Sequence, residues 1–388
     1  MVKINKMKIK FNSWPVYSNN EIKIINKVVK SGKVNYWTGN YCSIFENYFR
    51  KKFNLNYTVS IANGSVALDA ALSILNLKKN DEVLVTSRSY ITTASSIQKT
   101  PAKIKFLDVN LNNQNICLND LKKKINNKTK LIICVHLAGW PCDINKIKKI
   151  IGKRKILILE DCAQAHGAKI NGKYVGSMGD ISTWSFCNDK IMSTLGEGGM
   201  VACKNKNIYK KLWSYKDCGR NYNKIFNSKK NNNKLFKWIH DYDGTNLRMT
   251  EVQAAVGIEQ LKNLEKMINL RERNLKHIYS RIQKSKIVYC PILPENIKHA
   301  GYRCYLFCKN FSIRNRFIEY LNRNGIDANQ GSCPEIYKEK RFNLKNKIKL
   351  KNANKLGKIS VSLPCHHLLS GRDLSNIVRA INKFINLN

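Results

Sequence analysis

The sequence lacks any apolar run long enough to cross a bilayer, which would take about 20 residues. Its first residues, MVKINKMKIKFNSW, are basic but have no apolar core of the kind found in a secretory signal peptide. The thirteen cysteines are scattered, and pairs such as Cys304 and Cys308 have no second pair at a zinc-like spacing. We therefore expect a cytoplasmic protein with reduced thiols, no metal and no membrane partner.

Acidic residues are scarce: 26 Asp and Glu stand against 69 Lys and Arg, for a net charge of +43. Such an excess ordinarily suggests nucleic acid or another anionic partner. Here it is mostly lysine spread over the chain, without a basic stripe interleaved with aromatics, a zinc finger or an RNP-like motif. This pattern favours a solvated basic surface and no specific nucleic-acid site. A non-catalytic polyanion-binding or regulatory protein stays open as the alternative from another functional class.

Short apolar runs alternate with helical patterns along the first two thirds of the chain. The strand-like runs include 57–62, 104–107, 131–135, 156–159 and 181–186. This alternation predicts an α/β fold with a mostly parallel sheet. The length suits two domains, a large one over residues 1–262 and a smaller α+β one over 263–388, bridged by a long helix at 250–282. The polar, Asn/Lys-rich segment 221–238 is predicted to be a mobile surface loop, either a lid or a low-complexity insertion.

The segment from Lys155 to Cys203 has the pattern of a ligand site. The run Ile156–Leu159 ends at Glu160 and Asp161, and the carboxyl end of a buried strand is where an open α/β sheet places its ligand. A second run leads to Lys190 and the turn Gly196–Gly199. These features suggest a site for a cofactor carbonyl. Strand alternation lets only one of the two acids face it.

The sequence Asn63-Gly64-Ser65 lies between a strand-like run and an apolar helix. Free N–H groups at a helix start attract anions, and glycine permits close approach, so this motif predicts a phosphate site. The alternative is a plain turn in which Ser65 is the N-cap.

Together these segments resemble the DegT/DnrJ/EryC1/StrS family of sugar aminotransferases, which use pyridoxal phosphate (PLP) and have the fold-type-I architecture. The resemblance rests on EDCAQAHGA (160–168), on Ser185, Phe186 and Lys190, and on GEGG (196–199). Further matches are the unit around Asn246 and Arg248 and the late Ser-Leu-Pro at 362–364.

The resemblance implies a role for each matching residue. Lys190 would form the Schiff base with PLP and move the proton, and Asp161, in place of Glu160, would hold the pyridine nitrogen. Asn246 would reach the PLP phosphate of the neighbouring subunit, which implies a homodimer. The remaining cofactor contacts would be Gly64, Ser65 and Ser185 at the phosphate, Tyr90 on the ring and Gln164 at its phenolic oxygen.

Two arginines, Arg220 and Arg248, could bind substrate anions, although surface salt bridges are the alternative for each. Family members that act as dehydratases typically have histidine at the position of Lys190, so the lysine favours transamination. The segment 331–342 resembles the branch that aminates nucleotide-linked 4-keto-6-deoxy sugars. The expected reaction is amino transfer from L-glutamate to C4 of a dTDP-4-keto-6-deoxyhexose, for amino-sugar and glycan biosynthesis. A 3-keto sugar, or a UDP or GDP sugar, is the alternative.

Overall fold

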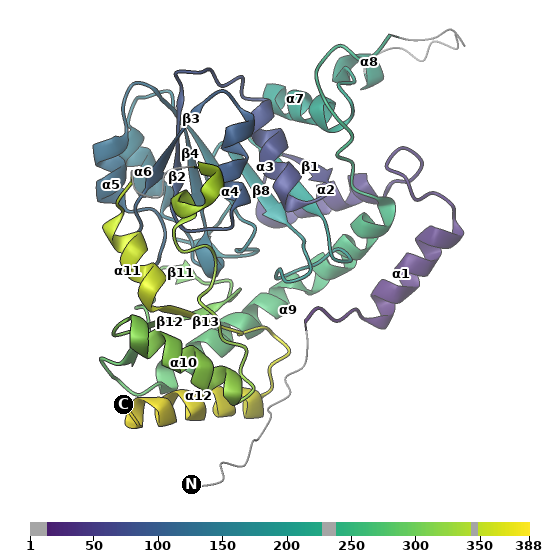
Figure 1. Ribbon diagram of the computed structural model, residues 1–388. Coiled ribbons are helices and arrows are strands. Elements are labelled where there is room, and N and C mark those ends of the chain that lie inside the picture. Colours follow the sequence, from purple (N-terminus) through teal and green to yellow (C-terminus); the bar gives the residue numbers. More distant parts are fainter. Residues whose placement is uncertain (1–13, 227–237, 343–347) are drawn as a thin grey trace.

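The computed structural model describes residues 14–226, 238–342 and 348–388. Its centre is a seven-stranded sheet in the order β1-β9-β8-β5-β4-β2-β3 (Figure 1). Neighbouring strands are parallel from β8 to β3, and β9 alone runs antiparallel to its two neighbours. The predicted α/β fold with a mostly parallel sheet is therefore confirmed. The strands are β1 (Tyr57–Ile61), β2 (Glu82–Thr86), β3 (Lys103–Leu107), β4 (Thr129–Val135), β5 (Leu157–Asp161), β8 (Ile181–Ser185) and β9 (Gly199–Cys203).

Helices cover both faces of this sheet because strand residues alternate between two apolar cores. One core joins the sheet to α2 (Tyr41–Phe53), α5 (Leu118–Lys124), α6 (Ile144–Ile151) and α9 (Glu251–Arg281). The other joins it to α3 (Gly64–Ser73), α4 (Thr92–Ser95), α7 (Lys206–Lys216) and α11 (Lys351–Ile359). Helix α1 (Asn19–Lys30) lies alongside α9 at the edge of the molecule (Figure 1).

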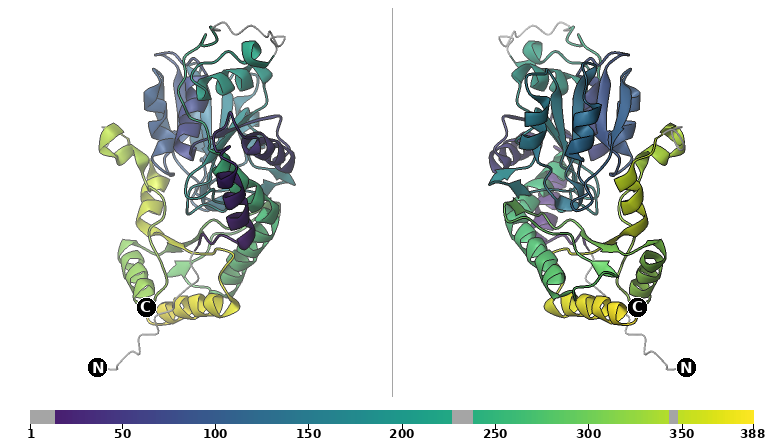
Figure 2. Two further views of the ribbon diagram at one scale, coloured as in Figure 1. Left: turned by 90° about the vertical axis from the view of Figure 1, so that its right-hand side faces the viewer. Right: turned by 90° about the vertical axis from the view of Figure 1, so that its left-hand side faces the viewer.

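A smaller unit follows, in which the sheet β10-β12-β13 packs on helices α10 (Phe311–Arg323) and α12 (Gly371–Asn386). Its strands are β10 (Val288–Tyr289), β12 (Cys304–Cys308) and β13 (Ser360–Leu363). A third small sheet, β11-β6-β7, is formed by Ile297–Lys298, Lys169–Ile170 and Lys173–Tyr174. The side views in Figure 2 show α9 and α11 running between the two units on opposite sides. The predicted division between residues 262 and 263 lies inside α9 and stays a prediction.

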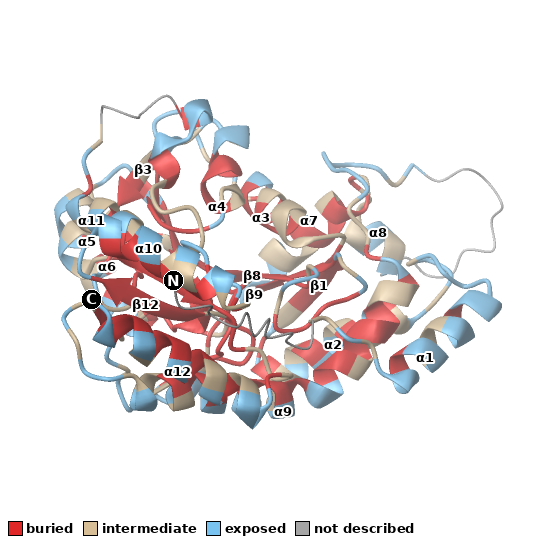
Figure 3. Cartoon of the chain, turned by 60° about the horizontal axis from the view of Figure 1, so that its bottom comes forward, coloured by how far each residue is buried: buried red, intermediate tan, exposed pale blue. Residues whose placement is uncertain are grey.

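Helix α9 begins with the capping box expected from the sequence, in which Thr250 and Gln253 each accept the other's backbone N–H. Its small residues let α2 come close, since a Cβ on Gly257 would lie 2.8 Å from a ring carbon of Phe45. Figure 3 shows this helix buried along the side that faces the core. None of the described helices is both long and apolar enough to span a bilayer.

The structure corrects the prediction of a loop over 221–238 at its start only. Residues Tyr222–Phe226 form the short helix α8, whose Tyr222 and Phe226 pack on Trp213 of α7. Residues 227–237 lie outside the described part of the chain. All thirteen cysteines are within the described ranges, and each is a free thiol.

Candidate active site

A cavity of about 510 Å³ lies at the carboxyl ends of β5 and β8, between the large sheet and the smaller unit. It is where an open α/β sheet binds its ligand. Side chains from the smaller unit complete it, among them Tyr302, Arg303 and Tyr305. The structure brings seven of the predicted site residues together in its wall: Gly64, Ser65, Tyr90, Asp161, Gln164, Ser185 and Lys190.

The start of helix α3 forms one end of this cavity. Asn63, not Ser65, is the N-cap, because its side chain accepts the N–H of Val66 at 3.0 Å. The N–H groups of Gly64 and Ser65 have no partner within the helix, as at any helix start. A Cβ on Gly64 would lie only 2.5 Å from Cβ of Ser185, so glycine is needed for this approach. Free N–H groups beside a serine hydroxyl make a suitable cradle for a phosphate.

Asp161 is a buried carboxylate in the cavity wall, only 4% exposed. Its Oδ2 accepts the hydroxyl of Thr93 at 2.8 Å, and Oδ1 accepts the N–H of Ala163 at 3.2 Å. Burial raises its pKa above the usual range, against the lowering effect of these hydrogen bonds. A cation placed against this carboxylate would offset the cost of burial, which is what a protonated pyridine nitrogen supplies.

Glu160 points away from the cavity, as strand alternation requires. Its carboxylate accepts backbone N–H groups of a turn after β7 and lies 3.0 Å from Nε2 of His136. Cys162 lies close enough to complete a possible three-ligand metal set with them. However, Nδ1 of His136 already accepts the N–H of Cys142 at 2.9 Å, and Glu160 is saturated with donors. The protein itself satisfies these groups, so we assign no metal to them.

Lys190 lies in the loop between β8 and β9, where Trp14 donates its indole N–H to the Lys190 carbonyl at 2.7 Å. Its Nζ lies 3.1 Å from Oδ1 of Asp189 and 3.2 Å from the hydroxyl of Tyr302. Burial lowers the pKa of this amine, but Tyr302 and Asp189 outweigh burial and raise the pKa above its usual value. In the protein without cofactor, the neighbours of this amine therefore favour its charged form.

Gln164 and Tyr90 occupy the remaining predicted positions in the wall. The amide oxygen of Gln164 accepts the N–H of Ala138 at 2.8 Å, and its nitrogen faces Ser332 at 3.4 Å. Tyr90 is 60% exposed although it lines the cavity, so one face of its ring is free for a ligand. The donor set therefore fits PLP: a phosphate cradle, a buried carboxylate, a ring face and a lysine amine.

The other three predicted residues lie outside this cavity. Arg248 forms an ion pair with the buried Asp217, and Arg220 lies 3.8 Å from the same carboxylate. The guanidinium of Arg220 also stacks over Trp37, 4.7 Å from the ring centre. Asn246 is exposed beside them, and its side-chain oxygen accepts the N–H of Arg248 at 3.3 Å. Within one subunit, these residues form a separate surface cluster.

Sequence reasoning missed the contributions of Asp189, Tyr302 and Arg303. Asp189 could have been noticed as an acid next to the lysine, but the other two are more than a hundred residues from Lys190. Among the described residues that line the cavity, Arg303 is the one arginine.

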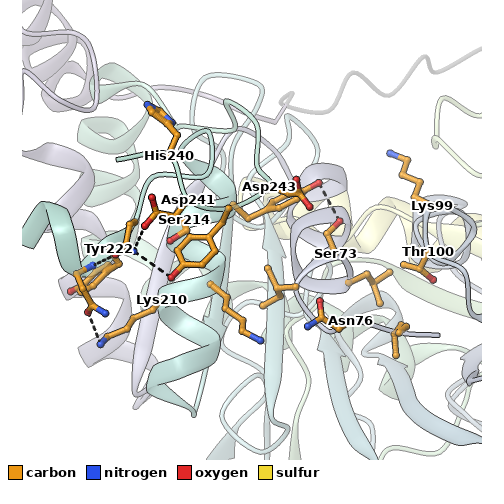
Figure 4. Close-up of a pocket in the computed structure, with 18 of the residues that line it drawn as sticks. Ser73, Asn76, Lys99, Thr100, Lys210, Ser214, Tyr222, His240, Asp241 and Asp243 are labelled. Carbon is orange, nitrogen blue, oxygen red and sulfur yellow. Dashed lines mark hydrogen bonds between the residues drawn. The ribbon is translucent and has the colours of Figure 1, made fainter. Parts of the chain in front are cut away.

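A second cavity, of about 910 Å³, lies away from these residues, between α3, α7 and the segment 240–243 (Figure 4). In this view Tyr222, His240 and Asp241 lie on one side and Ser73 and Lys99 on the other. None of the predicted site residues lines it. This cavity is larger, but it is not the reactive site, because neither the buried carboxylate of Asp161 nor the loop with Lys190 lines it.

Comparison with known proteins identifies the family. The model of the DegT/DnrJ/EryC1/StrS aminotransferase family matches residues 15–382, so the chain belongs to this family. The GDP-perosamine synthase of Escherichia coli O157:H7 is 33% identical over 350 residues, which cover 89% of this chain and 90% of the relative.

Similar solved structures agree with this family and with the fold. An aminotransferase from Psychrobacter cryohalolentis is 36% identical and superimposes with a TM-score of 0.93, covering 97% of this chain and 99% of the other. The E. coli GDP-4-keto-6-deoxy-D-mannose-3-dehydratase with bound hydrated PLP is 26% identical, with a TM-score of 0.86 and coverages of 97% and 99%. The predictions of the family, the fold, a sugar aminotransferase and PLP as cofactor are therefore confirmed.

Proposed function

We propose that this protein transfers the amino group of L-glutamate to C4 of a nucleotide-linked 4-keto-6-deoxyhexose, in the biosynthesis of an amino sugar for a glycan. The convergence of Lys190, Asp161 and the α3 start in one cavity supports this proposal most strongly. Lysine at position 190 further favours transamination over dehydration.

Each residue would contribute a defined step. Lys190 would hold the cofactor through Nζ and, once its amine is free, would take the proton from the donor's Cα. PLP, when bound, supplies a carbonyl that captures amines and a ring that accepts the electron pair of the broken C–H bond. Asp161 would hold a proton on the ring nitrogen, and the N–H groups of Gly64 and Ser65 with the hydroxyl of Ser185 would anchor the phosphate. Tyr90 and Gln164 orient the ring.

The nucleotide has two candidates. The resemblance of segment 331–342 led us to propose dTDP, and that proposal stands. GDP is the second candidate, because the relative with 33% identity is a GDP-perosamine synthase.

A substrate panel tests the reaction. With L-glutamate, we expect the purified holoenzyme to aminate dTDP- or GDP-linked 4-keto-6-deoxyhexoses, measured by mass spectrometry and by NMR of the carbon that carries the new amine. The paired 3-keto isomers and UDP sugars are the comparison. Amination of a 3-keto substrate alone would contradict C4, and amination only with another amino donor would contradict glutamate.

We further propose a homodimer in which Asn246 of one subunit reaches the site of the other, as the resemblance implies, and we extend this proposal to Arg220 and Arg248, which lie beside it. Support comes from their position together on the surface, away from the cavity of their own subunit. The amide of Asn246 is exposed and available to a second chain.

The cytoplasmic location also stays a prediction.

Arg303 is better placed than Arg220 or Arg248 to bind the carboxylate of the amino donor. Its guanidinium lies 3.7 Å from Asp189, directly beside the lysine that must reach the donor's Cα. The donor's α-carboxylate is bonded to that Cα, whereas the diphosphate of the sugar lies across the hexose ring from C4. Arg303 is therefore suited to the carboxylate of glutamate.

The change Arg303→Met is expected to lower kcat/KM for glutamate about 10- to 100-fold, the effect of losing a charge-assisted hydrogen bond of about 1.5–3 kcal/mol. Most of the change should be in KM for glutamate, with KM for the nucleotide sugar little altered. Arg323→Met, which removes an exposed arginine paired with Glu319, is the control. A rise in KM for the sugar instead would assign Arg303 to the diphosphate.

A further inference from the structure

The amine of Lys190 belongs to a closed group of three side chains. Asp189 and Tyr302 each contact Nζ, at 3.1 and 3.2 Å. Tyr302 also donates its hydroxyl to the second oxygen of Asp189. The backbone of Lys190 is fixed by Trp14 and by a hydrogen bond from its own N–H to Cys187. The side chain therefore has a defined resting place against the cavity wall, and the steps described so far leave Asp189 and Tyr302 without a role.

We propose that Asp189 and Tyr302 are positioning residues that stabilise the ammonium form of Lys190 while Nζ carries the proton moved during transamination. This inference rests on the proposed function. Two contacts at hydrogen-bond distance use two of the three donors of the ammonium group, and the remaining one is free to point into the cavity.

The proton transfer balances without any further reactant. The C–H bond at the donor's Cα breaks, and its electron pair stays on the side of Cα. The proton bonds to the lone pair of Nζ. The positive charge that appears on Nζ lies next to the carboxylate of Asp189, and Tyr302 fixes the orientation of that carboxylate. The same proton then leaves Nζ for the acceptor carbon, and the neutral amine returns.

The charges around Nζ make Asp189 the decisive partner. Asp161 is the other carboxylate that faces the lysine, but its hydrogen bonds go to Thr93 and Ala163. His166 is neutral, since burial, Lys190 and Arg271 lower its pKa to about 3. Although burial raises the pKa of Asp189, Lys190, Tyr302 and Arg303 hold it below its usual range, so its charge is present at neutral pH. The groups that interact with Lys190 are thus Asp189, Tyr302, Asp161 and His166. Arg303 and Arg271 act on Asp189 and Tyr302 from further away.

The test measures the protonation of Lys190 directly in the protein without cofactor. The protein is treated with limiting acetic anhydride at a series of pH values, and acetylation of each lysine is followed by peptide mass spectrometry. In Asp189→Asn, the midpoint of Lys190 acetylation is expected to fall by at least about one pH unit, a tenfold rise in neutral amine near pH 8. Tyr302→Phe should give a smaller shift, because the carboxylate remains.

The control is Glu259→Gln, which removes the carboxylate 2.6 Å from the exposed Lys262. It should leave the midpoint of Lys190 unchanged and that of Lys262 nearly so. With PLP bound, Asp189→Asn should also slow the half-reaction with glutamate and alter its pH profile, and Asp189→Glu should partly restore both.

The outcomes separate the inference from the proposed function. If Asp189→Asn left the midpoint of Lys190 acetylation unchanged, or accelerated this acetylation equally at every pH, the coupling between Asp189 and Lys190 would be overturned. A shifted midpoint with an unaltered glutamate half-reaction would overturn the role in proton transfer. If the midpoint shifts in Asp189→Asn but the wild-type protein transaminates no substrate, the proposed function is refuted while the coupling stands.

Discussion

Replacing Lys190 by alanine is expected to abolish covalent capture of PLP and to lower the transamination rate about 10³-fold or more, because nucleophile and proton carrier are lost together. Within the part of the chain that the structure describes, Lys190 is the one lysine that lines the cavity. Borohydride reduction of the protein with PLP, followed by intact mass and peptide mapping, should find one cofactor on Lys190 of the wild type and none there in Lys190→Ala.

A control is essential in a chain with 69 Lys and Arg residues, since PLP reacts with exposed amines as well. Lys204 is the matched choice, because burial and the nearby Lys148 lower its pKa and make it a reactive amine outside the cavity. Lys204→Ala should keep cofactor on Lys190 and full activity. Equal labelling of Lys190→Ala and wild type would contradict the assignment of the reactive lysine.

The local parts of the site could be predicted from the sequence because single segments carry them. A strand that ends in two acids, a glycine at a helix start and a lysine before a glycine turn each depend on residues close in the chain. Alternation along β5 also required one acid to face away, and the structure shows Glu160 doing so. Residue types alone did not say which acid that was, and the family pattern was needed to choose Asp161.

Two of the residues that sequence reasoning missed, Tyr302 and Arg303, come from a distant segment. Tyr302 contacts Lys190 across 112 positions, and only the packing of the smaller unit against the large sheet brings them together. The same packing places Arg303 in the cavity, whereas the arginines predicted from residue type, Arg220 and Arg248, share Asp217 elsewhere. No spacing in the sequence encodes such contacts.

Replacing Asp161 by asparagine is the second change with a large expected effect. We expect it to maintain or raise the stability of the protein without PLP and to lower its activity. Its pKa is raised by burial, so its favourable contribution to folding is present below the usual pKa of an aspartate, about 3.9, and is lost as pH rises through the folded value. Above that folded value the ionised group therefore destabilises the protein without cofactor. Asp161→Asn removes that charge, and asparagine can still accept the N–H of Ala163 and donate to the Thr93 hydroxyl.

We therefore expect Asp161→Asn without PLP to unfold at the same temperature as the wild type or higher at pH 7. Its affinity for PLP should fall about 10- to 100-fold, from the loss of a charge-assisted pair of about 1.5–3 kcal/mol. Its transamination rate should fall about 10²- to 10³-fold, because the ring nitrogen is no longer held protonated. Thermal unfolding with and without PLP, a PLP titration and the rate of the half-reaction with glutamate measure these three quantities.

The neighbouring acid supplies a control of opposite sign. Burial raises the pKa of Glu160, but His136 and the backbone N–H groups of Gly179 and Gly176 outweigh it and lower that pKa. The stability from Glu160 is thus present above its usual pKa and lost as pH falls through the folded value. Glu160→Gln should destabilise the protein by about 3 kcal/mol or more, with or without PLP. If Asp161→Asn behaved like Glu160→Gln, Asp161 would be a structural acid and not the partner of the cofactor ring.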